Sequence, residues 1–299
     1  NRNMATHAAG VVIAGKKLQL CRTFRGHQET ISSVALSHDA SHFASTDGKT
    51  IRLYRIHDRR ITEERIITHE KISQLTFHPN NAWLITASRK QVQLWDIFTG
   101  ELLFENTVID DGHFKSISCL AYRADGALLA VGGIVYDTAV QLWELNKNGL
   151  QLKHTLSEEK SGHDNSCTCL VFHPQMPILA VARRNNTVTL WDTSTGEKLL
   201  QHNTFGHDYE SGLNQDGVVS ITFNEDGSLL FASTNGGTNG TPVIRAWDIN
   251  SGNCVSVIST IEHRGNILLS FQKNRLITGN TDGAIHLLMP HKINNKTQW

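Results

Sequence analysis

Short runs of alternating apolar and polar residues recur along the chain, and such alternation is typical of β-strands with one buried face. Residues 50–53, 91–94 and 187–190 are the clearest cases, with an apolar residue at every second position. Turn-forming groups such as Ala124-Asp125-Gly126 and Glu225-Asp226-Gly227 separate the runs. Helical periodicity is almost absent, so the pattern predicts an all-β chain of short antiparallel strands.

The runs recur as a unit, and two columns of residues mark its register. A polar pair ending in His stands before the first strand of each unit, at Gly26-His27, Thr68-His69, Gly112-His113, Gly162-His163, Gly206-His207 and Glu262-His263. An aromatic residue ends the third strand of five units, at Tyr54, Trp95, Trp143, Trp191 and Trp247. Leu288 stands at the equivalent position of the sixth unit. Two columns in one register, with a period of about 40–45 residues or slightly more, predict six repeats of four strands each.

A lone four-stranded sheet cannot bury both of its faces, whereas sheets stacked around an axis can. Over residues 18–289 these repeats resemble the WD-repeat family, whose Trp-Asp pair occurs here in the second, fourth and fifth repeats. The resemblance implies a WD-repeat β-propeller of four-stranded antiparallel blades. It would form a single domain over residues 1–299, with repeats that start near residues 26, 68, 112, 162, 206 and 262.

The closure of this ring rests on the two ends of the chain. Residues 17–24 stand where a fourth strand of the last repeat belongs, so we expect them to pair with that repeat and close the ring. Residues 10–15 resemble a third strand followed by its turn, which keeps seven blades as the alternative to six.

The sixteen histidines, with Ser and Asp recurring near them, invite comparison with a hydrolase triad. The family resemblance implies a structural network instead, made by the His before the first strand, a hydroxyl on the second, an Asp in the next turn and the Trp of the third. The residues that match it are His27, Ser45, Asp47, His113, Asp137, Trp143, His163, Trp191, His263, Thr278 and Asp282.

Several positions depart from this pattern. Tyr54 replaces the Trp of the first repeat, Gly133 supplies no hydroxyl in the third, and Asn185 stands in for Asp in the fourth. In the second repeat Arg89 takes the Asp position, which puts the network there in question.

The amino-acid composition argues against several classes of function and indicates a cellular location. Lys and Arg together number 28, as do Asp and Glu, and this balance argues against general binding to nucleic acid or an anionic membrane. No apolar run has the length of a membrane span, and the first residues lack the pattern of a secretory signal. Five scattered cysteines predict a reducing, intracellular location, cytoplasmic or nuclear.

Catalytic, metal and cofactor signatures are absent from the sequence. It has no G-x-S-x-G elbow, no phosphate-binding loop and no H-E-x-x-H helix. Cys167 and Cys169 would point the same way along a strand, which favours packing over metal binding. We therefore expect no enzyme activity and no cofactor.

In propellers of this family, the loops before the first strand and between the second and third strands gather on one face. The candidate partner-binding residues on that face are Glu29, Lys71, Arg89, Lys90, Lys115, Asn165, Arg183, Arg184 and Arg264. The cationic ones suit an acidic or phosphorylated segment of a protein or peptide partner, since Arg pairs bidentately with carboxylate and phosphate. Charge reversal at Arg183 and Arg184 would test this.

The leading hypothesis is a non-enzymatic interaction scaffold or adaptor. The alternatives are a sensing or regulatory propeller of a larger multidomain protein, a nucleic-acid-binding propeller and an enzymatic propeller.

Overall fold

The computed structural model describes residues 26–57, 60–69, 71–107, 114–135, 140–146, 149–157, 166–203, 217–234, 243–259, 267–272, 275–280, 285–288, 291–293 and 296–298. Within these ranges every regular element is a β-strand. The same ranges contain no helix with the length and hydropathy needed to cross a membrane.

The strands form five antiparallel four-stranded sheets, each from four consecutive strands, which we call the first to fifth blades. The first blade holds β1 (Ser33–Leu36), β2 (His42–Thr46), β3 (Thr50–His57) and β4 (Arg60–Thr68). The second holds β5 (Ile72–Phe77), β6 (Trp83–Ser88), β7 (Gln91–Asp96) and β8 (Leu102–Thr107). The third holds β9 (Phe114–Tyr122), β10 (Leu128–Val135), β11 (Val140–Asn146) and β12 (Gly149–Leu156).

The fourth blade holds β13 (Cys167–Phe172), β14 (Ile178–Arg183), β15 (Thr187–Asp192) and β16 (Lys198–Asn203). The fifth holds β17 (Val218–Phe223), β18 (Leu229–Thr234), β19 (Val243–Asp248) and β20 (Cys254–Ser259). A sixth sheet has the three strands β21 (Ile267–Gln272), β22 (Arg275–Asn280) and β23 (Ile285–Leu288). A hairpin of β24 (His291–Ile293) and β25 (Lys296–Gln298), which the sequence pattern did not predict, follows it.

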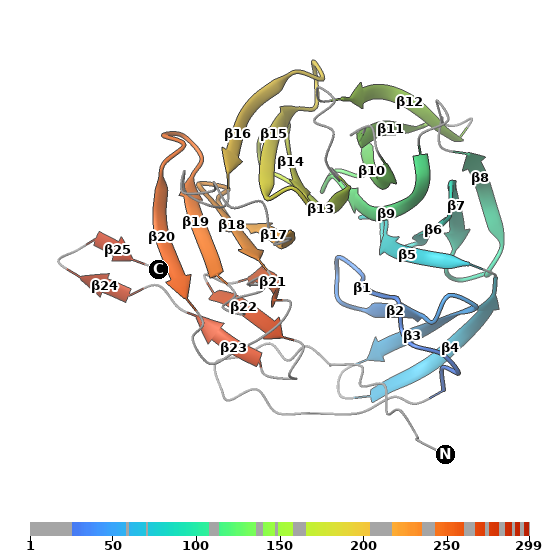
Figure 1. Ribbon diagram of the computed structural model, residues 1–299. Helices are drawn as coiled ribbons and strands as arrows, with labels where there is room; N and C mark the ends of the chain where they lie inside the picture. The colour runs from blue at the N-terminus through green and yellow to red at the C-terminus, as the bar shows by residue number, and fades with distance from the viewer. Residues whose placement is uncertain are drawn as a thin grey trace.

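The sheets stand around a common centre in chain order, with the first strand of each innermost (Figure 1). Each innermost strand contacts the next, from β1 with β5 to β17 with β21. The all-β prediction and the four strands per repeat are thus confirmed for the first five blades. The predicted closing strand at 17–24 and the segment at 10–15 lie outside the described residues.

The Trp-Asp pair has two separate structural roles. The Trp side chains of the second, fourth and fifth blades are buried between neighbouring sheets. The Asp that follows holds the next turn: Asp96 Oδ1 accepts the amides of Phe98 and Thr99, both at 2.8 Å. Asp192 does the same for Ser194 and Thr195, at 2.7 and 3.0 Å. These hydrogen bonds to the turn explain why an Asp follows the Trp in these repeats.

A recurring β-bulge at the start of the innermost strands corrects the expectation about two cysteines. The register slips between Cys167 and Cys169, because Cys167 pairs with Arg183 and Cys169 with Ala182. Such a slip changes the direction of the side chains that follow it. Cys167 therefore packs in the core between the third and fourth blades, whereas Cys169 packs in the core between the fourth and fifth.

Candidate functional site

We call the end of the molecule where the innermost strands begin the top face; it also carries the turns between second and third strands. In the first blade a polar cluster holds this turn. His27 Nδ1 lies 3.2 Å from Asp47 Oδ2, and His27 Nε2 lies 2.8 Å from the Ser45 hydroxyl. The structure thus brings together the three residues that the sequence assigned to the first repeat's network. Tyr54, in the Trp position, stacks on Phe43 with ring centroids 4.5 Å apart.

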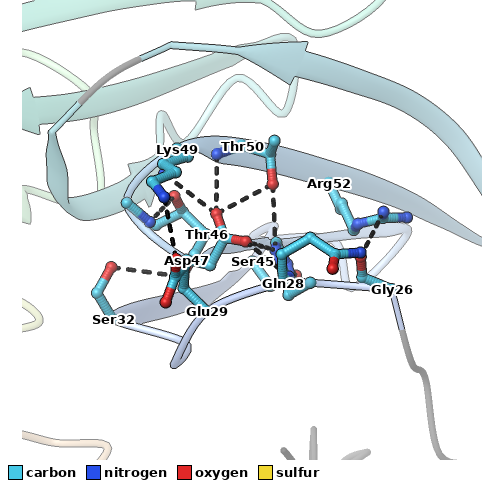
Figure 2. Close-up of polar contacts among 12 residues, drawn as sticks. Gly26, Gln28, Glu29, Ser32, Ser45, Thr46, Asp47, Lys49, Thr50 and Arg52 are labelled. Atoms are coloured by element: carbon cyan, nitrogen blue, oxygen red, sulfur yellow. Dashed lines mark hydrogen bonds and ion pairs between the residues drawn. The ribbon is translucent and has the colours of Figure 1, made fainter.

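Asp47 is the centre of this cluster (Figure 2). Its carboxylate accepts the backbone amides of Gln28, Lys49 and Thr50 at 3.1, 3.1 and 2.9 Å, and the Thr50 hydroxyl at 3.0 Å. Burial alone would raise the pKa of Asp47, but the amides of Thr50, Lys49 and Gln28 outweigh it and hold the pKa far below its usual 3.8. The ionised carboxylate therefore ties the segment before β1 to the turn between β2 and β3.

The chain Ser45–His27–Asp47 has the connectivity of a hydrolase triad. A nucleophilic hydroxyl must reach a substrate carbonyl, however, and Ser45 is only 3% exposed. The side chains of His27 and Asp47 are 6% and 2% exposed. The arrangement therefore fits a buried structural tie and not a reaction centre.

In the second blade a different set of groups joins the segment before β5 to the second and third strands. Trp95 Nε1 donates to Thr86 Oγ1 at 3.0 Å, and Thr86 Oγ1 donates to Gln93 Oε1 at 3.2 Å. Gln93 Nε2 lies 2.9 Å from His69 Nε2 and 2.7 Å from Glu105 Oε2. The buried Gln93 amide thus links the segment before β5 to the strands of its blade, whereas Asp47 in the first blade also binds the amides of the turn. Sequence reasoning missed Gln93, and the only signal for it was a polar residue inside an alternating strand.

The other repeats are described only in part. Trp191 Nε1 donates to Thr189 Oγ1 at 2.9 Å, and Asn185 Oδ1 accepts the Thr187 amide at 3.1 Å, as Asp47 does for Lys49. Trp143 Nε1 is buried with no hydrogen-bond partner in the described part of the chain, and Val131 occupies the place of the Thr86 hydroxyl. His113, Asp137, His163, His263 and Asp282 lie outside the described residues, and so does the side chain of Thr278.

Three candidate binding cations lie together on the top face of the second blade. Lys71 and Arg89 are exposed and flank the last backbone pair of the β5–β6 hairpin, Ile72 with Ser88, and Lys90 is half-buried beside them. Lys71 and Arg89 have φ of 66° and 53°, a region that residues other than Gly, Asn and Asp rarely adopt. The Arg89 carbonyl accepts the Ile117 amide of the third blade at 2.6 Å, which fixes this turn to its neighbour.

Arg183 was a candidate binding residue of the top face, but its side chain is buried. It is 1% exposed, because it is the last residue of β14 and pairs with Cys167 across the sheet, so the turn begins one residue later. Arg184 is exposed in that turn, where Gly217 of the fifth blade lies against it. Glu29 is exposed and pairs with Lys49 at 2.9 Å. Asn165 and Arg264 lie outside the described residues, as does the side chain of Lys115.

The opposite, bottom face carries a cavity and two histidine contacts that sequence reasoning did not predict. The cavity has a volume of about 380 Å³ and lies among the ends of β1, β5, β9 and β13, near Leu36, Phe77, Tyr122 and Phe172. His78 Nε2 donates to the Gly126 carbonyl of the next blade, and His173 Nε2 to that of Gly227, both at 3.1 Å. The His-Pro pairs at these two positions were the available signal.

Within the described residues, no group of three His, Cys, Asp or Glu side chains lies close enough together to hold a metal ion.

Sheets stacked around a centre and tied by turn-holding polar clusters define a repeat β-propeller. The family model of the WD domain, G-beta repeat, matches residues 18–55, 62–96, 105–144 and 151–192, which is about half of the chain. The chain therefore belongs to the WD-repeat family, whose members typically act as protein-interaction scaffolds.

Similar proteins carry the same repeats. WD repeat-containing protein 18 of Danio rerio is 25% identical over 226 residues, which cover 73% of this chain and 48% of that protein. Telomerase Cajal body protein 1 of Mus musculus is 24% identical over 69% of this chain and 37% of that protein. The guanine nucleotide-binding protein subunit beta of Oryza sativa subsp. japonica is 25% identical over 84% of this chain and 64% of that protein. The chain thus spans about half the length of the first of these relatives.

Proposed function

We propose that this chain is a non-enzymatic interaction scaffold that binds an acidic or phosphorylated protein segment on its top face. The observation that carries the proposal is the backbone of Lys71 and Arg89. Both residues are exposed cations with positive φ, in turns where Gly or Asn would cost less. Strained backbone positions concentrate at binding sites, where the surrounding structure holds them.

The chemistry of the partner follows from the charges on that face. Lys71, Arg89 and Lys90 lie within one hairpin, and Arg184 lies in the equivalent turn of the fourth blade. Arg offers a planar pair of donors that matches carboxylate and phosphate oxygens. The Ile117 amide of the third blade holds the Arg89 carbonyl, so binding at this turn would cost little ordering of the protein. Because Arg183 is buried, it has no part in the proposed contact.

The test is charge reversal at exposed positions only. The variant Arg89→Glu/Lys90→Glu should weaken binding to acidic and phosphorylated peptide arrays by at least about tenfold, since two favourable pairs become repulsive. The matched control is Arg60→Glu/Lys198→Glu, which makes the same charge change on the exposed outer strands β4 and β16. Equal binding by both variants and the unmodified chain would contradict the proposal.

The nucleic-acid alternative has its own outcome in the same experiment. Binding to an RNA or DNA duplex, with affinity that falls steeply as salt rises and without binding to any peptide, would favour that reading. An enzymatic propeller would require an accessible nucleophile or metal site, and the buried Ser45 offers none.

We also propose that the chain folds as a single domain of six blades and that residues 17–24 close the ring. The support lies on the open side of the first blade. Val34 and Leu36 are 62% and 37% exposed, whereas Leu75 and Phe77, which pair equivalently in the second blade, are 5% and 6% exposed. The equivalent pairs of the fourth and fifth blades are buried as well, and Leu120 and Tyr122 of the third blade are half-buried. The first blade thus exposes an apolar pair that a neighbouring blade would cover. Val34→Asp should then destabilise the chain about as much as Leu75→Asp, and a neutral effect would exclude closure.

The partial coverage of the relatives supports a further part of the proposal. A chain that spans about half of its first relative suits a propeller that works as one region of a larger protein, in a sensing or regulatory role. We also propose an intracellular location, cytoplasmic or nuclear, in keeping with the free thiols of Cys119, Cys167, Cys169 and Cys254.

A further inference from the structure

Two cysteines from neighbouring blades face one another in the core. Cys119 lies on β9 of the third blade and Cys167 on β13 of the fourth, and their sulfur atoms are 2.9 Å apart. The residues are 7% and 2% exposed. Ser118 Oγ donates to the Cys167 carbonyl at 2.6 Å, so the two strands are also joined directly beside the thiols. The pair thus spans the contact between two separate sheets, which we call the third seam.

The equivalent positions of the other seams hold no such pair. Register places Ser33 opposite Ile72 in the first seam, Gln74 opposite Ile117 in the second, and Cys169 opposite Val218 in the fourth. In each of these, an apolar side chain of the later blade meets a small or polar one of the earlier blade. The cysteine pair is therefore a local substitution into a general packing arrangement and is not required by the fold.

Gly132 makes the room for the two sulfur atoms. A Cβ at this position would lie 2.6 Å from Cys167 Sγ and 2.7 Å from Cys119 Sγ. The register-equivalent residues in the first, second, fourth and fifth blades are Thr46, Ala87, Ala182 and Ser233, each with a Cβ. The absence of a side chain at Gly132 lets both thiols approach from opposite sides.

We propose that Cys119 and Cys167 are a redox-sensitive pair that a peroxide oxidises to a disulfide across the third seam. The two S–H bonds break and one S–S bond forms; the two electrons and two protons reduce hydrogen peroxide, whose O–O bond breaks, to two molecules of water. Thiols reduce the bond again by exchange. A metal site is the other use of clustered thiols, but the described residues include no group of three ligands.

Burial sets the rate of this reaction. Loss of solvation raises the pKa of the Cys119 thiol well above its usual value and keeps it protonated, and a protonated thiol is a poor nucleophile. Oxidation therefore proceeds when the seam opens locally, and the closed disulfide is in turn protected from reductants. The bond would fix the third and fourth blades to each other close to the top-face turn that carries Arg184.

The experiment compares the full chain with Cys167→Val, which copies the Cys169–Val218 pair of the fourth seam and should therefore fold. Both proteins carry Cys21→Ser and Cys254→Ser, so that Cys119, Cys167 and Cys169 are the remaining thiols. After prolonged treatment with hydrogen peroxide, the Cys167-containing protein should lose two alkylatable thiols on denaturation and yield a cross-linked Cys119–Cys167 peptide. Its Tm should rise by about 4–8 °C, and dithiothreitol should reverse the rise.

The controls make each outcome decisive. Cys167→Val should keep its thiols and its Tm under the same treatment, and Cys119→Ser, which copies Ser33 of the first seam, should do the same if the first variant folds poorly. The unmodified chain is treated in parallel, because it keeps the exposed Cys254, whose oxidation reports that the oxidant is active. The proposal is overturned if Cys254 is oxidised while Cys119 and Cys167 both remain alkylatable, or if Cys119 couples to Cys169 instead.

Discussion

The first and second repeats join equivalent segments of the chain with different polar groups. In the first, an ionised carboxylate, Asp47, collects three backbone amides and a hydroxyl beneath His27. In the second, the neutral Gln93 lies between His69 and Thr86 and is fully buried. Both sets connect the segment before the innermost strand to the second and third strands. The same position of the fold therefore accepts either a charge or an amide, provided that the buried polar groups are paired.

The bottom face shows the same contrast. The first repeat again uses a carboxylate, since Asp39 accepts the hydroxyls of Ser37 and Ser41 at 2.8 and 2.7 Å. The second uses the neutral ring of His78, whose Nδ1 accepts the Asn80 amide at 3.1 Å while Nε2 donates to the next blade. As the pH falls, the second repeat should therefore begin to lose stability first, and the first repeat should resist moderate acid.

Asp47→Ala should have the largest effect of the changes that test this comparison. It leaves three amides and the Thr50 hydroxyl without their acceptor in a buried site, and it removes the oxygen that lies 3.2 Å from His27 Nδ1. We expect a loss of about 3 kcal/mol in the free energy of unfolding at neutral pH. Urea denaturation measures it.

Asp47→Asn is the matched variant, because it keeps one acceptor oxygen while it removes the charge and the second acceptor, and it should lose about half as much. The contribution of the carboxylate is complete above the usual pKa of 3.8 and disappears as the pH falls below it, because the folded-state pKa is depressed. A loss below about 0.5 kcal/mol for Asp47→Ala would show that the turn does not depend on this tie.

Gln93→Leu should cost less, about 2 kcal/mol, because it removes a neutral group and leaves the Thr86 hydroxyl and His69 without it. Gln91→Leu is the control on the same strand, since Gln91 also donates to Glu105 but lies nearer the surface. Thermal denaturation of the two variants should rank Gln93→Leu as clearly the less stable. Equal stability would mean that the amide is replaceable and that the two repeats are not equivalent.

The sequence predicted the architecture because its signal is repeated: the His column, the Trp column and the alternating strands all fix one register. It also brought together His27, Ser45 and Asp47, since each stands at a definite distance from those columns. The same reasoning failed at Gln93, because a group that replaces a missing carboxylate from a different strand is recognisable only once the strands are paired.

Arg183 and Cys167 show a second limit. Both depend on the β-bulge at the start of β13, which shifts the register by one residue. A single-residue slip reverses which side chains are buried, and no residue type in this segment marks it. Arg183 is therefore buried, whereas its neighbour Arg184 is exposed.

The smallest effect expected from this comparison is a pH dependence carried by His78. Burial lowers the pKa of His78 below its usual 6.5, so the unfolded chain takes up a proton at a higher pH than the folded one. Stability is therefore complete above about pH 6.5 and declines as the pH falls toward the lowered folded-state value. His78→Asn, which copies Asn224 of the fifth blade, should reduce this loss of stability in acid by less than about 1 kcal/mol. The control His57→Asn, on the exposed end of β3, should leave the loss of stability unchanged. Urea denaturation at several pH values between neutrality and acid measures the slope, and an unchanged slope in His78→Asn would assign the decline to other groups.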